Sequence, residues 1–234
     1  MEKTPTSERV AAMLGRNYWF ARRPAELRRK LVAHAQVSTV EAGHWIYDAG
    51  DEAHGLYGVL SGSVTTYVAL DNGEDVPVNI SGPSSIFGYA AQVLGGRRVT
   101  TAVAHERSEI IFIPQQALAA IARDLPSLWL HFAELATEQL TWAVKVLAER
   151  SRLPPQTQVA SRLQAYAAVW ANEDGTATLP IRQDELAEMA GLSRKTVNLI
   201  LRDFERRGVV ALGYREIGIR DAAALRRLAA AEHP

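Results

Sequence analysis

The stretch RQDELAEMAGLSRKTVNLILRDFERRGVV, residues 182–210, decides the fold of the C-terminal part of the chain. Its apolar residues recur at helical spacing on both sides of Gly191, which predicts two helices of about 8 and 14 residues joined by a turn. Gly191 can adopt the conformation that such a turn requires, and Ser193 is a favoured N-cap for the second helix. The pattern is typical of a helix-turn-helix.

The first turn of the second helix carries side chains suited to reading DNA. In a helix-turn-helix this turn meets base edges in the major groove, where Arg suits guanine and Asn suits adenine. Farther on, VALGYREIGIRD predicts two short strands, a wing whose tip would lie beside the DNA backbone. The candidate DNA contacts are Ser193, Arg194, Lys195, Thr196, Asn198, Arg202, Tyr214 and Arg215. A plain helical hairpin with a solvated, charged face is the alternative.

The local charge favours DNA binding more than the total charge does. The chain has 26 basic and 26 acidic residues, so its formal net charge is zero. Between Ser193 and Arg207, however, five residues are basic and two are acidic. The positive charge therefore gathers where the motif lies.

Residues 37–114 have a different sequence pattern, in which short runs of β-branched and aromatic residues are separated by Gly, Asp and Asn. Asn72-Gly73 between two of these runs is a hairpin signal. The runs predict an antiparallel β sandwich or barrel. Two short helices, interrupted at Pro24, are expected before it, and a helix over residues 115–122 after it.

Residues 127–153 contain no Gly or Pro and predict one long helix, which Pro154-Pro155 ends as a hinge. Its apolar residues recur at spacings of 4 and 3, as in a two-stranded coiled coil. The predicted dimer seam is Leu128, Phe132, Leu135, Gln139, Trp142 and Val146. A second stripe beside it is Trp129, Ala133, Ala136, Leu140, Ala143 and Leu147. One stripe can pack on the β region while the other meets a partner copy. Helices are also expected over residues 159–171 and after Asp221.

A β region, a long helix and a winged helix-turn-helix, in this order, resemble the Crp/Fnr superfamily of bacterial regulators over nearly the whole chain. The residues that carry the likeness are Gly43, Gly50-Asp51, Leu56-Tyr57, Gly62, Gly73, Phe87-Gly88 and, most specifically, the segment from Gln183 through LAEMAGLSRKTVNLILRDFERRG. The resemblance implies an α+β chain with an N-terminal antiparallel β-roll (a cyclic-nucleotide-binding-like double-stranded β-helix), a long dimerisation helix and a C-terminal winged helix-turn-helix. The expected domains are residues 1–125, 126–154 and 155–234.

In nucleotide-binding members of that superfamily, a Glu after Phe-Gly holds the ribose, and an Arg followed by a small residue holds the cyclic phosphate. The matching positions here are Tyr89, Arg98 and Val99, and the adenine-facing pair falls near Ala143 and Val144. Only Arg98 keeps the pattern, so a cyclic nucleotide is disfavoured against another small ligand or a structural remnant. Arg98 also fits a merely solvated loop. The candidate effector-binding residues are Phe87, Gly88, Tyr89, Arg98, Val99 and Thr100.

The composition excludes several other classes of site. The chain has no Cys, which excludes disulfides, thiolate zinc sites and cysteine-held iron–sulfur clusters. Six His residues show no diagnostic spacing, so haem is disfavoured, with His131 on the long helix as the strongest axial candidate. Without an export signal or a membrane-length apolar run, a cytoplasmic protein is expected. No catalytic or metal-binding motif is present, so neither an enzyme nor a metal site is expected.

The expected function is a sequence-specific DNA-binding transcription regulator. It would act as a homodimer on a pseudo-palindromic operator in double-stranded DNA. RNA polymerase is a further candidate partner. The sequence does not identify the effector. On the second helix of the motif, nucleotide-responsive members of the superfamily carry Arg, Glu and Arg, and the matching residues here are Arg194, Lys195 and Leu199. A different operator sequence is therefore expected. Asn198 is a candidate for the missing base contact. The alternative is a small-molecule sensor that signals to a protein partner and shows no salt-dependent affinity for DNA.

Overall fold

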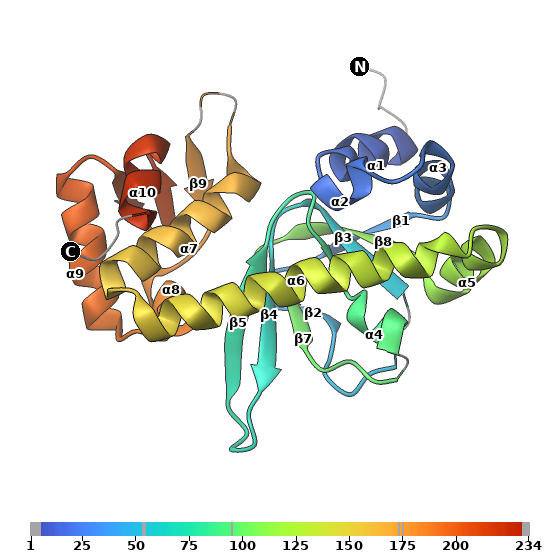
Figure 1. Cartoon of the computed structure of the whole chain (residues 1–234), viewed down its shortest axis with the longest axis horizontal. Helices are drawn as coiled ribbons and strands as arrows, with labels where there is room; N and C mark the ends of the chain where they lie inside the picture. Colours follow the sequence, from blue (N-terminus) through green and yellow to red (C-terminus); the bar gives the residue numbers. More distant parts are fainter. Residues whose placement is uncertain (1–5, 53–54, 95, 173, 175, 231–234) are drawn as a thin grey trace. The chain divides into compact units, whose positions relative to one another are not determined.

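The structure, a computed structural model, describes residues 6–52, 55–94, 96–172, 174 and 176–230 (Figure 1). The chain divides into two compact units, Met1–Asp75 with Asn79–Thr141, and Val76–Val78 with Trp142–Pro234. The boundary falls inside the long helix α6 (Ser127–Arg152), which begins at the predicted residue and contributes to both units. No helix in the described ranges has the length and apolarity needed to cross a membrane.

The first unit contains the predicted β-roll. Its described strands form two four-stranded sheets, in the orders β1-β8-β3-β6 and β2-β7-β4-β5. The strands are β1 (Gln36–Val40), β2 (Trp45–Tyr47), β3 (Gly55–Ser61), β4 (Val64–Ala69), β5 (Asp75–Ser81), β6 (Ile86–Phe87), β7 (Thr101–Ala104) and β8 (Ser108–Pro114). Buried side chains from both sheets, including Val59, Val64 and Ile110, form one core between them. The hairpin predicted at Asn72-Gly73 joins β4 to β5, and Gly73 takes a φ of 82° there.

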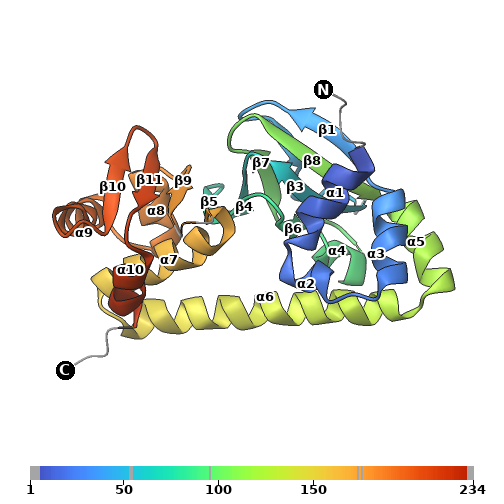
Figure 2. The ribbon, with the colours of Figure 1, turned by 90° about the horizontal axis from the view of Figure 1, so that it is seen from above.

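A helical layer covers the sheet that contains β1, β8 and β3 (Figure 2). Its helices are α1 (Thr6–Gly15), α2 (Tyr18–Ala21), α3 (Ala25–Ala33), α5 (Gln115–Asp124) and the first half of α6, while the short α4 (Ala90–Leu94) follows β6. Three helices therefore precede the β-roll where two were predicted. The extra one, α2, forms because the Asn17 side chain accepts the backbone N–H of Phe20 and caps it.

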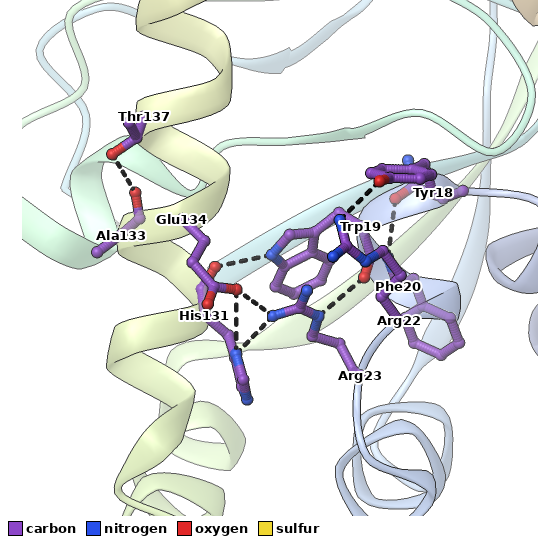
Figure 3. Close-up of polar contacts among 10 residues, drawn as sticks. Tyr18, Trp19, Phe20, Arg22, Arg23, His131, Ala133, Glu134 and Thr137 are labelled. Atoms are coloured by element: carbon purple, nitrogen blue, oxygen red, sulfur yellow. Dashed lines mark hydrogen bonds and ion pairs between the residues drawn. The ribbon is translucent and has the colours of Figure 1, made fainter.

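Polar contacts fix α2 to α6 (Figure 3). Trp19 Nε1 donates to the carbonyl oxygen of His131 at 2.7 Å, and the Trp19 ring stacks on Phe132 with 5.9 Å between centroids. The buried guanidinium of Arg23 pairs with Glu134 and with Nδ1 of His131, and it holds the pKa of Glu134 below its usual value. His131 thus faces α2 with its Nδ1 already in contact with these two groups. Two other histidines weighed as haem ligands, His54 and His233, lie outside the described residues.

The predicted dimer seam on α6 is wrong in its first half. Leu128, Phe132 and Leu135 are at most 4% exposed, because they form part of the chain's own core under α1 to α3. Side chains buried in this way have no surface left for a partner. Farther along, Gln139 is exposed, Val146 is half-buried, and Trp142 lies under the Arg162 guanidinium at 5.1 Å from its ring centroid.

The second stripe on α6 is the one that carries exposed apolar surface. Trp129 is 42% exposed, Leu140 64% and Leu147 68%, and Val144 beside them is 57% exposed. Ala133 and Ala136 lie between these larger residues and leave room for close approach. The first half of the first stripe thus packs inside the chain, and the second stripe is the one that faces solvent.

The second unit is the predicted winged helix-turn-helix. Its elements beyond α6 are α7 (Pro155–Trp170), β9 (Ala177–Leu179), α8 (Gln183–Ala190), α9 (Arg194–Arg206), β10 (Val210–Gly213), β11 (Glu216–Ile219) and α10 (Ala222–Ala229). The sequence missed β9, which adds a third strand to the wing in the order β10-β11-β9. Helix α7 begins earlier than predicted because Pro155 suits its first turn. The helix expected after Asp221 is confirmed, and the Asp221 side chain caps it.

The corner between α6 and α7 was predicted as a hinge, and polar contacts bridge it. Gln158 Nε2 donates to the carbonyl oxygen of Leu153 at 2.8 Å. Ser161 Oγ lies 3.0 Å from both carboxylate oxygens of Glu149. Any rotation at Pro154-Pro155 would have to break these bonds, so the last turns of α6 are fixed to α7.

Candidate DNA interface and effector site

The turn between α8 and α9 has the geometry expected from its sequence. Gly191 adopts a left-handed φ of 65°, and the N–H of Leu192 reaches back to the carbonyl oxygen of Ala187 at 2.9 Å, which closes α8. The end of α6 covers this turn, since a Cβ added at Gly191 would lie 1.8 Å from Nη2 of Arg150. The left-handed φ is what favours glycine here, because the exposed Arg150 side chain can move aside.

Ser193 caps the recognition helix α9. Its Oγ accepts the backbone N–H of Thr196 at 3.1 Å, and the two hydroxyl oxygens lie 2.8 Å apart. The cap fixes the direction in which the first turn of α9 presents its side chains. Ser193 is thus placed to position the neighbouring residues as well as to approach DNA.

We expect Ser193→Ala to lower the free energy of unfolding of the DNA-binding unit by about 1 kcal/mol, because it removes the cap from α9. Ser193→Gly should cost only a few tenths of a kcal/mol, because glycine is tolerated at N-caps. Urea denaturation followed by circular dichroism measures both. Equal losses for the two variants would show that the cap is not what stabilises α9.

The charged candidates on α9 are accessible. Arg194, Lys195 and Arg202 are exposed, and in the described ranges their side chains make no ion pair. By contrast, Arg206 and Arg207 at the end of the helix pair with Asp203 at 3.1 and 3.3 Å. Positive charge without an ion pair therefore lies on Arg194 and Lys195 in the first turn of α9, where a helix-turn-helix meets base edges, and again on Arg202 about two turns later.

Asn198, a predicted base contact, also makes a contact inside the motif. It is half-buried, and its Nδ2 donates to Gln183 Oε1 at 2.6 Å. One of the two N–H groups of its amide is therefore bonded to α8, and Asn198 joins the two helices of the motif. Leu199, by contrast, is 61% exposed. The pairing of Gln183 with Asn198 is not apparent from the sequence, because it crosses between two helices.

The wing presents the two predicted tip residues. Strands β10 and β11 pair from Val210 with Ile219 to Gly213 with Glu216, leaving Tyr214 and Arg215 in the turn. Tyr214 is 91% exposed, and Arg215 has a φ of 60°. The Glu205 carboxylate at the end of α9 accepts the N–H of Leu212 at 2.9 Å. The wing is therefore bonded to the recognition helix.

In the β-roll, Arg98 is folded into the protein. It is 4% exposed, and its guanidinium carbon lies 3.9 Å from the ring centroid of Tyr47 and 5.2 Å from that of Tyr57. Nη1 donates to the carbonyl oxygen of Gly88 at 3.3 Å and Nη2 to that of Gly55 at 3.2 Å, while Nε has no hydrogen-bond partner among the described residues. The interpretation of Arg98 as part of a solvated loop is wrong, because aromatic rings and two carbonyls enclose it.

The other effector candidates surround this arginine unevenly. Phe87 is buried and stacks on Tyr57 with centroids 5.5 Å apart, and Gly88 has a φ of 78°. Tyr89 is half-buried, and burial raises the pKa of its hydroxyl to about 12, so it is a neutral phenol. Val99 is 73% exposed. Thr100, which is half-buried, interacts with Tyr47.

The contact between Tyr47 and Arg98 is not apparent from the sequence. The two residues are 51 positions apart, and nothing in the spacing of WIYD indicates the contact. Burial raises the pKa of both Tyr47 and Tyr57, so these rings also remain neutral beside the cation.

Comparison with known proteins identifies the family. A family model for the cyclic nucleotide-binding domain matches residues 37–124, and one for the Crp-like helix-turn-helix domain matches residues 157–228. The chain is 32% identical over 188 residues to the cyclic AMP receptor protein of Thermus thermophilus, covering 80% of this chain and 85% of that relative. The chain belongs to the Crp/Fnr superfamily.

Other Crp/Fnr relatives agree with this assignment. A CRP-like cAMP-activated global transcriptional regulator of Mycobacterium tuberculosis is 27% identical over 190 residues, covering 80% of this chain and 85% of that protein. The solved structure of FixK2 from Bradyrhizobium japonicum shares the fold with a TM-score of 0.75 at 22% identity, covering 85% of this chain and 99% of FixK2. The chain is thus a Crp/Fnr-type transcription regulator with a helix-turn-helix DNA-binding domain.

Proposed function

We propose that this Crp/Fnr regulator acts as a homodimer that reads a two-fold symmetric operator through α9 and the wing. The observation that carries the proposal is the pair of exposed cations, Arg194 and Lys195, in the first turn of α9, which follows the Ser193 cap; neither makes an ion pair with a residue that the structure describes. Because DNA lies in the cytoplasm of a bacterium, the proposed place of action is the cytoplasm, and RNA polymerase is the candidate further partner. Binding, with no catalysis, accounts for this role.

The exposed stripe of α6 supports the homodimer. Trp129, Ala133, Ala136, Leu140, Ala143 and Leu147 follow one another at spacings of 4 and 3. This is the repeat of a two-stranded coiled coil, in which the same stripe on each copy packs against its equivalent. Two copies related by a two-fold axis would present two α9 helices to matching half-sites.

Selection of binding sites from a random double-stranded DNA pool tests the proposal. We expect the full-length protein to enrich a two-fold symmetric site whose half-sites are about 34 Å apart, one helical turn of DNA. Affinity for that site should fall steeply with rising salt, because phosphate contacts release counterions. Failure to enrich any sequence, or binding that ignores salt, would contradict the proposal and favour the protein-partner alternative.

The residues of the β-roll do not fit a cyclic nucleotide. The guanidinium that would meet the phosphate lies against Tyr47 and donates to two backbone carbonyls. At the ribose position, the Tyr89 phenol replaces a carboxylate. Ala143 and Val144, which the resemblance aligns with the adenine-facing pair, are apolar and offer no side-chain hydrogen bond. We infer that the DNA binding of this regulator is not controlled by a cyclic nucleotide. The candidate effector residues around Arg98 either bind a different small ligand or are a structural remnant.

Titration of the purified protein with cyclic AMP tests this inference. We expect no binding heat at micromolar or sub-millimolar nucleotide, because an Arg98 side chain already enclosed by aromatic rings would have to leave them. Thermal melts with and without cyclic AMP should coincide as an independent check. Saturable binding at micromolar concentration would show that Arg98 is released readily and that the inference is wrong.

A further inference from the structure

Leu199 is an apolar side chain on the polar face of α9. The apolar side of this helix is filled by Val197, Leu201 and Phe204, each of them fully buried. Leu199 lies outside that set and is 61% exposed. It contributes little to the core of its own unit, although exposing a leucine to water is unfavourable.

The neighbours of Leu199 indicate what covers it. Lys195 lies four residues before it and Arg202 three residues after it, so all three share one face of the helix. Both basic residues are exposed and make no ion pair in the part of the chain that the structure describes. This surface would suit a polyanion that carries an apolar group. The anionic groups would contact Lys195 and Arg202, and the apolar group would pack on Leu199.

Asn198, next to Leu199, is turned partly toward α8. It is half-buried, and one N–H of its Nδ2 donates to Gln183 Oε1 at 2.6 Å. The outward surface at this turn of α9 is therefore the leucine side chain.

We propose that Leu199 selects thymine by packing against its C5-methyl group in the major groove of each half-site. Thymine is the standard base whose major-groove edge carries a methyl group. The other bases would place polar edges against the leucine and leave them without hydrogen bonds, which costs free energy. This inference rests on the proposed function, because it requires α9 to lie in the groove.

Replacing thymine by deoxyuridine removes the methyl group and leaves base pairing unchanged. With the operator obtained by selection, single replacements along one half-site should identify one thymine at which the wild-type protein loses about fourfold in affinity, the value expected for one buried methyl group. Replacing the symmetric thymine as well should roughly square that loss, to about 15-fold, because the two contacts are far apart.

The variant Leu199→Ala separates this contact from other effects of the methyl group. It should bind the thymine operator less tightly than the wild type and lose no further affinity on replacement by deoxyuridine. Tyr214→Ala, which shortens an exposed apolar side chain on the wing, should keep the full wild-type loss. The variant Leu199→Arg should shift selection at the same position toward guanine.

Three outcomes would overturn the proposal. One is the absence of any thymine at which deoxyuridine weakens binding, and another is an equal loss for wild type and Leu199→Ala. The third is a Leu199→Ala variant with unchanged DNA affinity that no longer supports transcription, because Leu199 would then contact a protein. If no operator is selected in the first place, it is the proposed function that fails.

Discussion

Replacing Arg194 by alanine is expected to lower affinity for the selected operator by about 30-fold to about 10⁴-fold. A bidentate contact between Arg and guanine is worth about 1–3 kcal/mol, and a homodimer makes it twice, while each 1.4 kcal/mol changes affinity tenfold. Arg194 is exposed on the first turn of α9 and makes no ion pair among the described residues. Gel shifts or fluorescence anisotropy at fixed salt measure the loss.

The stability of Arg194→Ala should match that of the wild type, because the side chain packs against no core and alanine favours the helix. Arg206→Ala is the matched control, since it removes the same charge from the same helix. Arg206 pairs with Asp203 at the far end of α9 and should contribute little to base reading. If both variants bound the operator equally well, the first turn of α9 would not be the part that contacts the bases. A lower melting temperature for Arg194→Ala would point to a structural effect instead.

The variant carrying both Leu140→Glu and Leu147→Glu is expected to be a folded monomer that has lost most of its operator affinity. The two leucines are 64% and 68% exposed in one chain, so the new charges are solvated in the monomer and buried in a coiled coil. Without a second reading helix held nearby, affinity should fall by about 10²–10⁴-fold. Light scattering gives the oligomeric state, and anisotropy gives the affinity.

Two comparison variants make this test specific. Gln139→Glu adds the same charge one residue earlier, about 100° around the helix, and should leave the dimer intact. Phe132→Glu should unfold the first unit rather than dissociate a dimer, because Phe132 is 0% exposed and even truncation of such a residue costs about 3–5 kcal/mol. A folded monomer from Gln139→Glu, or a dimer that tolerates both leucine replacements, would refute the exposed stripe as the seam.

Local signals allowed much of this fold to be predicted. The start of α6 follows from Pro126 and its end from Pro154-Pro155, and the turn before α9 follows from Gly191 and the Ser193 cap. Each of these signals acts on backbone groups only a few residues away. The order of domains followed from the same signals, combined with the change from β-branched runs to helical spacing.

Long-range packing determined what the sequence could not show. Both stripes of α6 have the same spacing, and the choice between them depends on α2, more than 100 residues earlier, which places Trp19 on Phe132 and Arg23 on Glu134. Arg98 follows a glycine-containing loop, yet it is buried because Tyr47 and Tyr57 arrive from other strands to enclose it. Asn198 suits adenine by its chemistry, and a contact from α8 uses one of its two N–H groups.

The bond between Glu205 and the Leu212 N–H has a kinetic consequence. Together with the pairing of β11 to β9, it fixes the wing to the recognition helix within one chain. The reading unit is thus preorganised, and little conformational entropy is left to lose on docking. The rate of association with DNA should then follow diffusion and electrostatic steering, with mutations in the interface changing mainly how long the complex lasts.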